Sequence, residues 1–124
     1  MIYLDTHALI YVAAGETNRL GAAARRAIDR EDALASAASV LELELLHEIG
    51  RLKPTASKLI SILAGDIGLR ICDLPFRTIV DRALSESWTR DPFDRLIVAN
   101  AKAAGAGLVT KDARIHENYS RALW

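Results

Sequence analysis

The chain has 124 residues and carries sixteen basic and sixteen acidic side chains, so its formal net charge at pH 7 is zero. This length suits one domain with a hydrophobic core and is too short for two ordinary domains. A content of 51% hydrophobic and 26% charged residues is typical of a globular protein and excludes a disordered chain. The balanced charge gives no sign of a nucleic-acid partner, although a local basic surface is compatible with it. The single cysteine, Cys72, excludes an internal disulfide and a zinc site built on cysteines.

We expect no export signal, because nothing at the amino terminus of this sequence marks secretion. It reads Met1-Ile2-Tyr3-Leu4-Asp5, without a basic leader or a long apolar segment. No run in the chain reaches the ~20 apolar residues of a membrane-spanning helix. We therefore expect a cytoplasmic protein with no membrane partner.

Short apolar runs alternate with segments of helical character along the chain. We predict strands at 2–4, 33–35, 69–72 and 107–110, and a fifth strand at an edge within 120–124. We predict helices at 7–14, at 20–30, from Ser36 or Ser39 to about Gly50, at 55–64 closed by Gly65, from 76 to about 87, and from the Asp91 segment to about Gly105. Strands joined by helical crossovers form parallel sheets covered on both faces. The alternation predicts one three-layer α/β domain over residues 1–124, with a short parallel β-sheet of four or five strands flanked by helices.

Asp94 occupies a position where a carboxylate is costly. The segment Asp91-Pro92-Phe93-Asp94 has the form of a helix start, with Asp91 as the cap and Pro92 at the first helical position. At about 100° per residue, Asp94 falls in the middle of an apolar arc made by Ile97, Val98, Ala101 and Ala104. A buried carboxylate requires something to compensate its charge. Capping explains Asp91 better than Asp94, so we favour Asp94 as the functional group.

Glu42 repeats this anomaly on an earlier helix. It projects from the middle of an arc made by Leu45, Leu46 and Ile49, whereas Glu44 and Glu48 are expected to face solvent. The alternative is that Glu42 lies at the helix start and turns its side chain away from the core.

Two further acids follow predicted strands. Asp5 comes directly after the first strand and Asp112 closely follows the fourth. If these strands are neighbours, both carboxylates face the crevice at the carboxyl edge of the sheet, where ligands bind in open parallel sheets. The alternative for each is the capping of the next helix.

Four acids at one edge of a sheet need a counter-charge. Two like charges 4 Å apart repel by about 4 kcal/mol at an effective dielectric constant near 20, and no Lys or Arg lies on the same predicted faces. Carboxylate oxygens suit Mg²⁺ or Mn²⁺, and the absence of Cys and His among the four disfavours zinc. Such ions activate water and stabilise in-line displacement at phosphorus. The four acids therefore indicate metal-dependent phosphodiester hydrolysis.

Four segments, in this order along essentially the whole chain, resemble the PIN domain. They are Leu4-Asp5-Thr6-His7-Ala8-Leu9, Ser39-Val40-Leu41-Glu42 followed by Gly50-Arg51-Leu52, Arg90-Asp91-Pro92-Phe93-Asp94-Arg95-Leu96-Ile97-Val98-Ala99, and Leu108-Val109-Thr110-Lys111-Asp112. More narrowly, the chain is similar to the VapC-type toxins of bacterial type II toxin–antitoxin systems. It departs from many relatives at Leu41, where they carry tryptophan, a difference that concerns packing.

The resemblance implies an Mg²⁺- or Mn²⁺-dependent endoribonuclease that acts as the toxin of a toxin–antitoxin pair. Its pocket acids, carried over by motif, are Asp5, Glu42, Asp94 and Asp112, with Asp91 as a candidate auxiliary ligand. The resemblance also implies a homodimer and a cognate antitoxin that inserts a segment into the acidic groove.

These acids are expected to divide the work. We expect Asp5, Asp94 and Asp112 to hold the metal and Glu42 to orient or deprotonate the attacking water. Thr6 and Thr110 flank two of the acids and are candidates for positioning them through hydroxyl hydrogen bonds; a role as caps or strand ends is the alternative. His7 is expected to be structural, as part of a helix start.

Basic residues near the ends of the same elements are candidates for contact with RNA phosphates. They are Arg51, Lys53, Arg90, Arg95, Lys111 and Arg114. For each of them the alternative is a solvated charge on the surface.

Two other functions are compatible with the residues. One is a non-catalytic phospho-acceptor module that uses Asp73 and Lys111, although such modules usually have paired acids after the first strand, where Asp5 stands alone. The other is a metal-dependent nuclease acting on DNA or a phosphomonoesterase, because nothing in the residues distinguishes ribose from deoxyribose. RNA as the substrate follows from the resemblance only.

Overall fold

The computed structural model describes residues 1–124 and contains a single sheet of five short strands. The strands are β1 (Ile2–Leu4), β2 (Ala33–Ala35), β3 (Arg70–Ile71), β4 (Gly107–Val109) and β5 (Ala122–Leu123). Their order across the sheet is β3-β2-β1-β4-β5, and every neighbouring pair is parallel. The predicted parallel sheet is confirmed, including its fifth strand at the edge.

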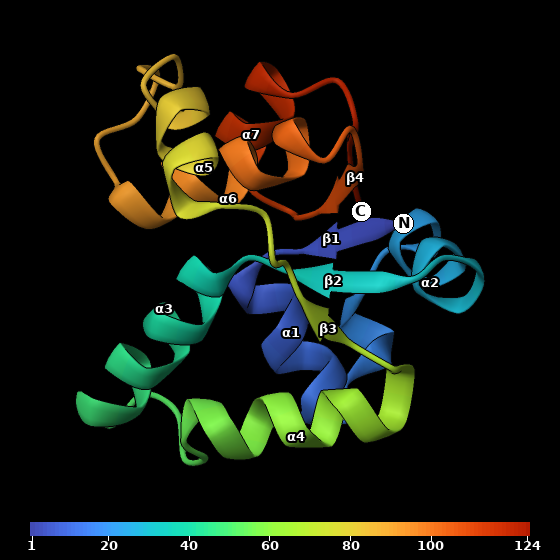
Figure 1. The fold of residues 1–124 in the computed structure, drawn as a ribbon. Helices are drawn as coiled ribbons and strands as arrows, with labels where there is room; N and C mark the ends of the chain where they lie inside the picture. The colour runs from blue at the N-terminus through green and yellow to red at the C-terminus, as the bar shows by residue number, and fades with distance from the viewer.

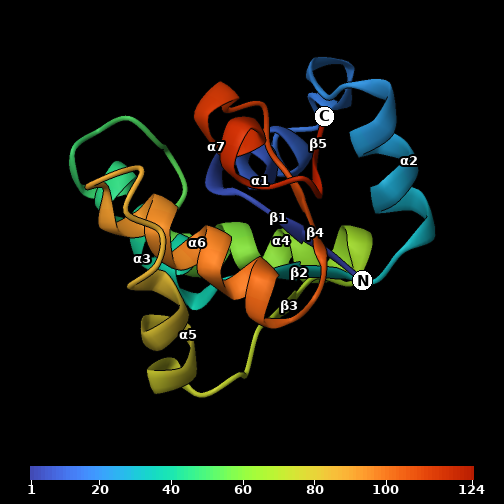
Figure 2. The same ribbon diagram turned by 90° about the horizontal axis from the view of Figure 1, so that it is seen from above.

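Seven α-helices and one 3₁₀ turn connect and cover these strands (Figure 1). They are α1 (Thr6–Ala13), the turn η1 (Thr17–Arg19), α2 (Ala22–Arg30), α3 (Ala37–Glu48), α4 (Ala56–Ile67), α5 (Phe76–Ala83), α6 (Pro92–Ala103) and α7 (Ala113–Asn118). Helices α1 and α4 lie on one face of the sheet, and α5, α6 and α7 lie on the other. Figure 2 shows both chain termini close to α2, and the Met1 amino group pairs with Glu31 just after that helix. The α/β three-layer class is therefore confirmed.

Alternate residues of the central strands build two separate cores, as the period of two in a β-strand requires. Ile2 and Leu4 of β1 belong to the core beneath α1 and α4. Tyr3 between them, together with Leu108 of β4, belongs to the core beneath α6 and α7. Both faces of β1, the central strand of the sheet, are thus covered.

Two predicted helix ends were wrong. Helix α4 continues through Gly65 to Ile67 and ends at Gly68, which adopts a left-handed φ of 65°; glycine reaches this conformation without strain and is tolerated within a helix. Helix α5 ends at Ala83 rather than near Ser87. The residues after it form a loop that leads into α6.

Helix α3 turns a different face to the core than its sequence pattern indicates. Ser39 and Leu43 are fully buried, whereas Leu45 is 39% and Ile49 65% exposed. The carboxyl-terminal end of α3 extends beyond the sheet (Figure 1), which leaves Leu45 and Ile49 exposed. The prediction of a buried arc around Glu42 was therefore wrong, although Glu42 itself is half-buried.

Candidate active site

Asp5 and Asp112 come together because their strands are neighbours. Leu4 of β1 pairs with Val109 of β4, and the backbone N–H of Asp5 continues this ladder by donating to the Val109 carbonyl at 3.0 Å. Both acids also cap helices. Asp5 accepts the N–H of Ala8 at 2.9 Å, and Asp112 accepts that of Arg114 at 2.8 Å. Capping fixes the orientation of each side chain at the carboxyl edge of the sheet.

The start of α6 brings Asp94 to the same edge. Asp91 caps this helix by accepting the N–H groups of Phe93 at 2.8 Å and Asp94 at 3.1 Å. The carboxylate of Asp94 accepts no hydrogen bond and forms no ion pair. Ile97 one turn later is buried, so the structure confirms that Asp94 lies on the inner side of the helix. Capping thus accounts for Asp91 and leaves Asp94 unexplained by the fold.

Glu42 reaches the site from α3 and is held there by α1. Its Oε1 accepts a hydrogen bond from the hydroxyl of Thr6, a residue that is 2% exposed. Glu44 does not face solvent as predicted, because its Oε1 accepts the N–H of Ala56 at 3.1 Å and so supports the start of α4. The two glutamates therefore have separate partners on opposite sides of α3.

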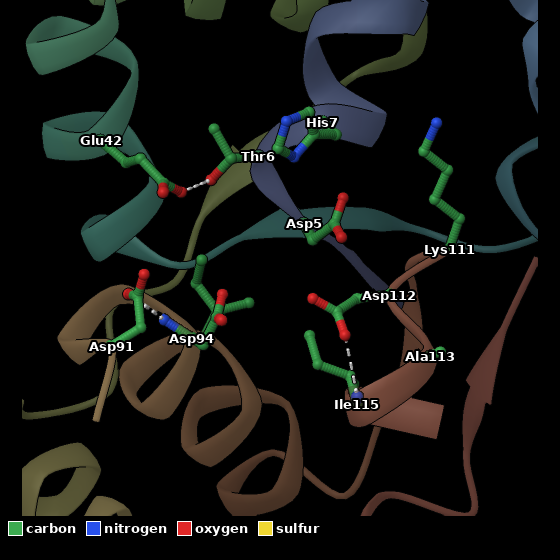
Figure 3. Close-up of a pocket in the computed structure, with 11 residues that line it drawn as sticks. Asp5, Thr6, His7, Glu42, Asp91, Asp94, Lys111, Asp112, Ala113 and Ile115 are labelled. Atoms are coloured by element: carbon green, nitrogen blue, oxygen red, sulfur yellow. Dashed lines mark hydrogen bonds between the residues drawn. The ribbon is translucent and has the colours of Figure 1, made fainter. Parts of the chain in front are cut away.

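One pocket of about 550 Å³ gathers these side chains. Figure 3 shows Asp5, Asp94 and Asp112 around the same space, with Glu42 and Thr6 along one side. The residues that line it are Asp5, Thr6, His7, Glu42, Asp91, Asp94, Ile97, Lys111, Asp112, Ala113 and Ile115. The structure thus brings the four sequence-predicted acids to one cavity.

The electrostatics of the pocket disfavour ionised acids. Burial, together with the negative charges of Asp91, Asp112, Glu42 and Asp5, raises the pKa of Asp94 to about 6. Burial is also the main cause that raises the pKa of Asp5 and of Glu42. Hydrogen bonds from Thr110 to Asp5 and from Thr6 to Glu42 act in the opposite direction. Ionised carboxylates in this cluster are therefore destabilised by burial and mutual repulsion, and a bound cation would reduce this destabilisation.

The chemistry of this donor set fits a hard divalent ion. Every candidate ligand is a carboxylate oxygen, as Mg²⁺ and Mn²⁺ prefer, and Asp94 has no protein partner to lose on binding one. No three acidic or imidazole side chains converge closely enough in this conformation to hold an ion. Asp5 and Asp112 are engaged with backbone N–H groups of the next helices. The side chains of these acids would therefore have to rotate before three of them could bind one ion together.

His7 is a pocket residue whose exposure the sequence did not indicate. It was expected to be structural, but its side chain is exposed and lines the cavity (Figure 3). Its charge lowers the pKa of both Asp5 and Glu42. The signal available in the sequence was its position two residues after a strand-end acid.

A buried ion pair that the sequence did not indicate supports the loop before α6. Glu86 is 3% exposed and its carboxylate pairs with the ammonium of Lys102 on α6 at 2.7 Å. The same carboxylate accepts the indole N–H of Trp88 at 2.6 Å. Lys102 also donates to the carbonyl of Asn118 at the end of α7 at 3.2 Å. This network ties the helices that carry Asp94 and Asp112 to one another.

Of the predicted RNA-contacting residues, only Lys111 lines the pocket. Arg90 and Arg114 are exposed and donate to the carbonyls of Ser87 and Trp88, and Arg95 is half-buried with an unpartnered Nε. Arg51 and Lys53 are exposed. None of the six forms an ion pair with a carboxylate. Asp73, the acid required by the phospho-acceptor alternative, is exposed and lies outside the pocket.

Comparisons with known proteins identify the family of the chain. The model of the PIN domain family matches residues 2–120. Ribonuclease VapC22 of Mycobacterium tuberculosis is 38% identical over 121 residues, which cover 94% of this chain and 91% of that protein. No helix of this chain is long and apolar enough to cross a membrane.

Two solved structures share the fold. A chain of the VapBC2 structure from Rickettsia felis, bound to a DNA fragment from its promoter, superimposes with a TM-score of 0.63 at 19% identity and covers 94% of this chain and 92% of that one. A chain of the VapBC-1 structure from nontypeable Haemophilus influenzae gives a TM-score of 0.62 at 17% identity and covers 100% of this chain and 96% of that one. These two likenesses show the fold, and the family match with the 38% identical relative establishes that the chain belongs to the PIN domain family and, within it, to the VapC proteins.

Proposed function

We propose that residues 1–124 act as one metal-dependent endoribonuclease unit, which hydrolyses RNA phosphodiester bonds as the toxin of a toxin–antitoxin pair. The observation that carries the proposal is the gathering of four carboxylates in one pocket of a PIN-domain chain. They are Asp5, Glu42, Asp94 and Asp112. The 38% identity to a protein named as a ribonuclease supports RNA as the substrate. A cytoplasmic location accompanies this proposal as a prediction.

Asp5, Asp94 and Asp112 are the residues that would hold Mg²⁺ or Mn²⁺, with Asp91 as an auxiliary ligand. When bound, such an ion supplies an activated water and stabilises the charge that develops on the phosphate. The site is compatible with this role because the three acids lie on two adjacent strand ends and one helix start.

Glu42 is the proposed proton acceptor. The Thr6 hydroxyl holds its Oε1 and leaves Oε2 without a protein partner. Because burial raises the pKa of Glu42, this carboxylate is a better base than an exposed glutamate. Thr110 has the corresponding proposed role at Asp5, because its hydroxyl lowers the pKa of that carboxyl and accepts the N–H of Asp112 at 3.1 Å.

Basic residues that lack a carboxylate partner are the proposed contacts to the RNA backbone. The set is that predicted from the sequence: Arg51, Lys53, Arg90, Arg95, Lys111 and Arg114. A cation that lacks a carboxylate partner is free to meet phosphate oxygens. DNA remains the competing substrate, and the two are separated by cleavage assays on matched single strands.

Two protein partners belong to the proposal. The two solved relatives are VapBC structures, which supports an antitoxin partner, and we infer that a cognate antitoxin inserts a segment into the acidic pocket of this chain. We further infer a homodimer. Leu41, Leu45 and Ile49 form an exposed apolar row along α3, with exposures of 56%, 39% and 65%, and a second copy of the chain is the proposed cover for it.

The test is cleavage of a single-stranded RNA and a DNA of the same sequence, with Mg²⁺ or Mn²⁺ and with a chelator. The wild-type chain is expected to cut RNA only when a metal is present, and Asp5→Asn to abolish cutting while it keeps the fold. Asp66→Asn, which removes an exposed acid of α4, is the matched control and retains activity. Undiminished cleavage by Asp5→Asn in metal-supplemented buffer would overturn the assignment.

A further inference from the structure

Two cations from distant segments converge on the ring of Tyr11 beside the acidic pocket. Tyr11 lies on α1 and is 7% exposed. The guanidinium of Arg19, on the turn η1, lies 4.2 Å from the ring centroid. The ammonium of Lys111, in the loop after β4, lies 5.2 Å from the same centroid. The Arg19 guanidinium and the Lys111 ammonium are therefore separated by no more than the sum of these two distances.

The ring that holds these cations is itself fixed. Its hydroxyl accepts a hydrogen bond from Nη2 of Arg19 at 3.3 Å. Trp124 packs edge-on against it, with the ring centroids 6.2 Å apart. Since the Tyr11 side chain belongs to the core beneath α1 and α4, it offers a rigid surface on which the two flexible cationic side chains are positioned.

The Lys111 ammonium has no anionic partner inside the protein. Its ammonium has three donors but makes no hydrogen bond or ion pair, although Lys111 is adjacent in sequence to Asp112 and lines the same pocket. Figure 3 shows its side chain at the rim, directed away from Asp112. Lys111 therefore links the pocket to the Tyr11 ring and leaves its donors available to a ligand.

Arg19 is partly neutralised by one acid. Its Nη1 pairs with Glu16 at 3.0 Å, and both side chains are about half exposed. A surface pair of this kind contributes little and exchanges readily with another anion. Glu16 is thus a competitor for any anionic ligand of Arg19.

We propose that Tyr11, Arg19 and Lys111 form a binding site for a backbone phosphate next to the scissile one, in a single strand of RNA that leaves the pocket past Lys111. The site deepens the proposed nuclease function and rests on it. The four pocket acids repel a polyanion, so a substrate strand needs positive charge where it leaves them. The Tyr11 cluster provides it from the adjacent rim and acts on binding, not on bond cleavage.

The first experiment measures kcat and KM on a short single-stranded oligoribonucleotide that the wild-type chain cuts at one bond. Lys111→Met and Arg19→Met, both at exposed positions, are each expected to raise KM about three- to tenfold with kcat nearly unchanged. Each should also lower the slope of log affinity against log salt by about 0.7. Glu16→Gln is expected to lower KM, because it frees Arg19. Arg77→Met, which removes an exposed cation on α5, is the matched control with wild-type KM.

Two variants of Tyr11 test whether its aromatic ring is required for binding. Tyr11→Leu removes the ring and is expected to raise KM, and Tyr11→Phe, which keeps the ring, to restore KM most of the way to wild type. Because Tyr11 belongs to the core, circular dichroism accompanies both variants. If Tyr11→Leu fails to fold, the two cation variants and Glu16→Gln decide the matter.

A second experiment places the contacted phosphate by replacing one phosphate at a time with a neutral methylphosphonate. In the wild-type chain one position beside the scissile bond should raise KM on neutralisation, and in Lys111→Met the same change should have little further effect. Wild-type KM and salt slope in Lys111→Met, Arg19→Met and Glu16→Gln, with wild-type cleavage intact, would overturn this inference alone. A wild-type chain that cuts no RNA would instead overturn the proposed function and this site with it.

Discussion

Replacing Asp94 with asparagine should separate its role in the fold from its role in binding metal. Without metal, burial and the charges of the neighbouring acids raise the pKa of the half-buried Asp94 carboxylate to about 6, from an ordinary 3.8. The folded protein thus binds a proton at Asp94 more tightly than the unfolded chain does. At pH 7 the ionised Asp94 carboxylate therefore lowers the free energy of unfolding, and Asp94→Asn removes this destabilisation.

The magnitude follows from the pKa difference. One unit corresponds to about 1.4 kcal/mol, so two units set an upper limit of about 3 kcal/mol. Because Asp94 is only half-buried, solvent screening reduces this to about 1 kcal/mol. An acid in the first turn of α6 also stabilises the helix dipole by about 0.3–1 kcal/mol. The net expectation without metal is a variant that is as stable as wild type or more stable by up to about 1 kcal/mol.

The pH dependence has a definite sign. Since the folded-state pKa is raised, the unfavourable term is fully present above about pH 6 and disappears as the pH falls towards the ordinary value of 3.8. The stability of Asp94→Asn relative to the wild-type chain should therefore increase between pH 4 and pH 6 and stay constant above that range. Thermal unfolding in a chelator measures this, with about 4 °C expected for each kcal/mol.

Adding Mn²⁺ should reverse the order. A ligand that binds only the folded chain raises its stability, so the wild-type midpoint should rise with metal concentration and that of Asp94→Asn should rise much less. Asp66→Asn, which removes an exposed acid outside the pocket, should behave as wild type throughout. A variant that is more than 1 kcal/mol less stable than wild type without metal would refute this reasoning, because capping and helix-dipole effects would then outweigh repulsion.

Three further predictions concern the supports and surfaces of the site. Thr6→Val, which removes the hydroxyl that holds Glu42, should lower kcat about 10- to 100-fold with KM nearly unchanged; an unchanged kcat in steady-state kinetics would contradict the role of Thr6. Lys102→Met should lower the free energy of unfolding, measured in urea, by about 3 kcal/mol because it leaves Glu86 buried without its partner. Adding Glu86→Gln to this variant should recover most of the loss. Equal stability of the single and double variants would argue against the ion pair. Leu45→Glu should shift sedimentation from dimer to monomer, and a dimer that persists would exclude the α3 row as the interface.

The acids of the site could be predicted from sequence where local rules determine them. Asp5 and Asp112 each follow a short apolar run, and parallel strands place such residues at the same edge of a sheet. The strand order that makes β1 and β4 neighbours was a condition of that prediction. Asp94 stood out because it interrupts the apolar arc of its own helix, and that arc is buried at Ile97.

Other features depend on contacts that sequence periodicity does not contain. The apolar row of α3 indicates a core-facing helix, yet Ile49 is 65% exposed because that end of α3 extends beyond the sheet. Glu86 looks like an ordinary polar loop residue, and its burial is explained by its partners, Lys102 from α6 and the indole N–H of Trp88. Helix α4 passes through Gly65 because a later glycine, Gly68, supplies the left-handed end.

Binding of Mn²⁺, followed by calorimetry at pH 7, tests the central claim most directly, because it requires no knowledge of the RNA target. The account predicts binding to the wild-type chain that Mg²⁺ displaces, and a loss of tenfold or more in affinity in each of Asp5→Asn, Asp94→Asn and Asp112→Asn, with none in Asp66→Asn. Wild-type affinity in all three pocket variants would contradict the assignment of these acids as the metal site.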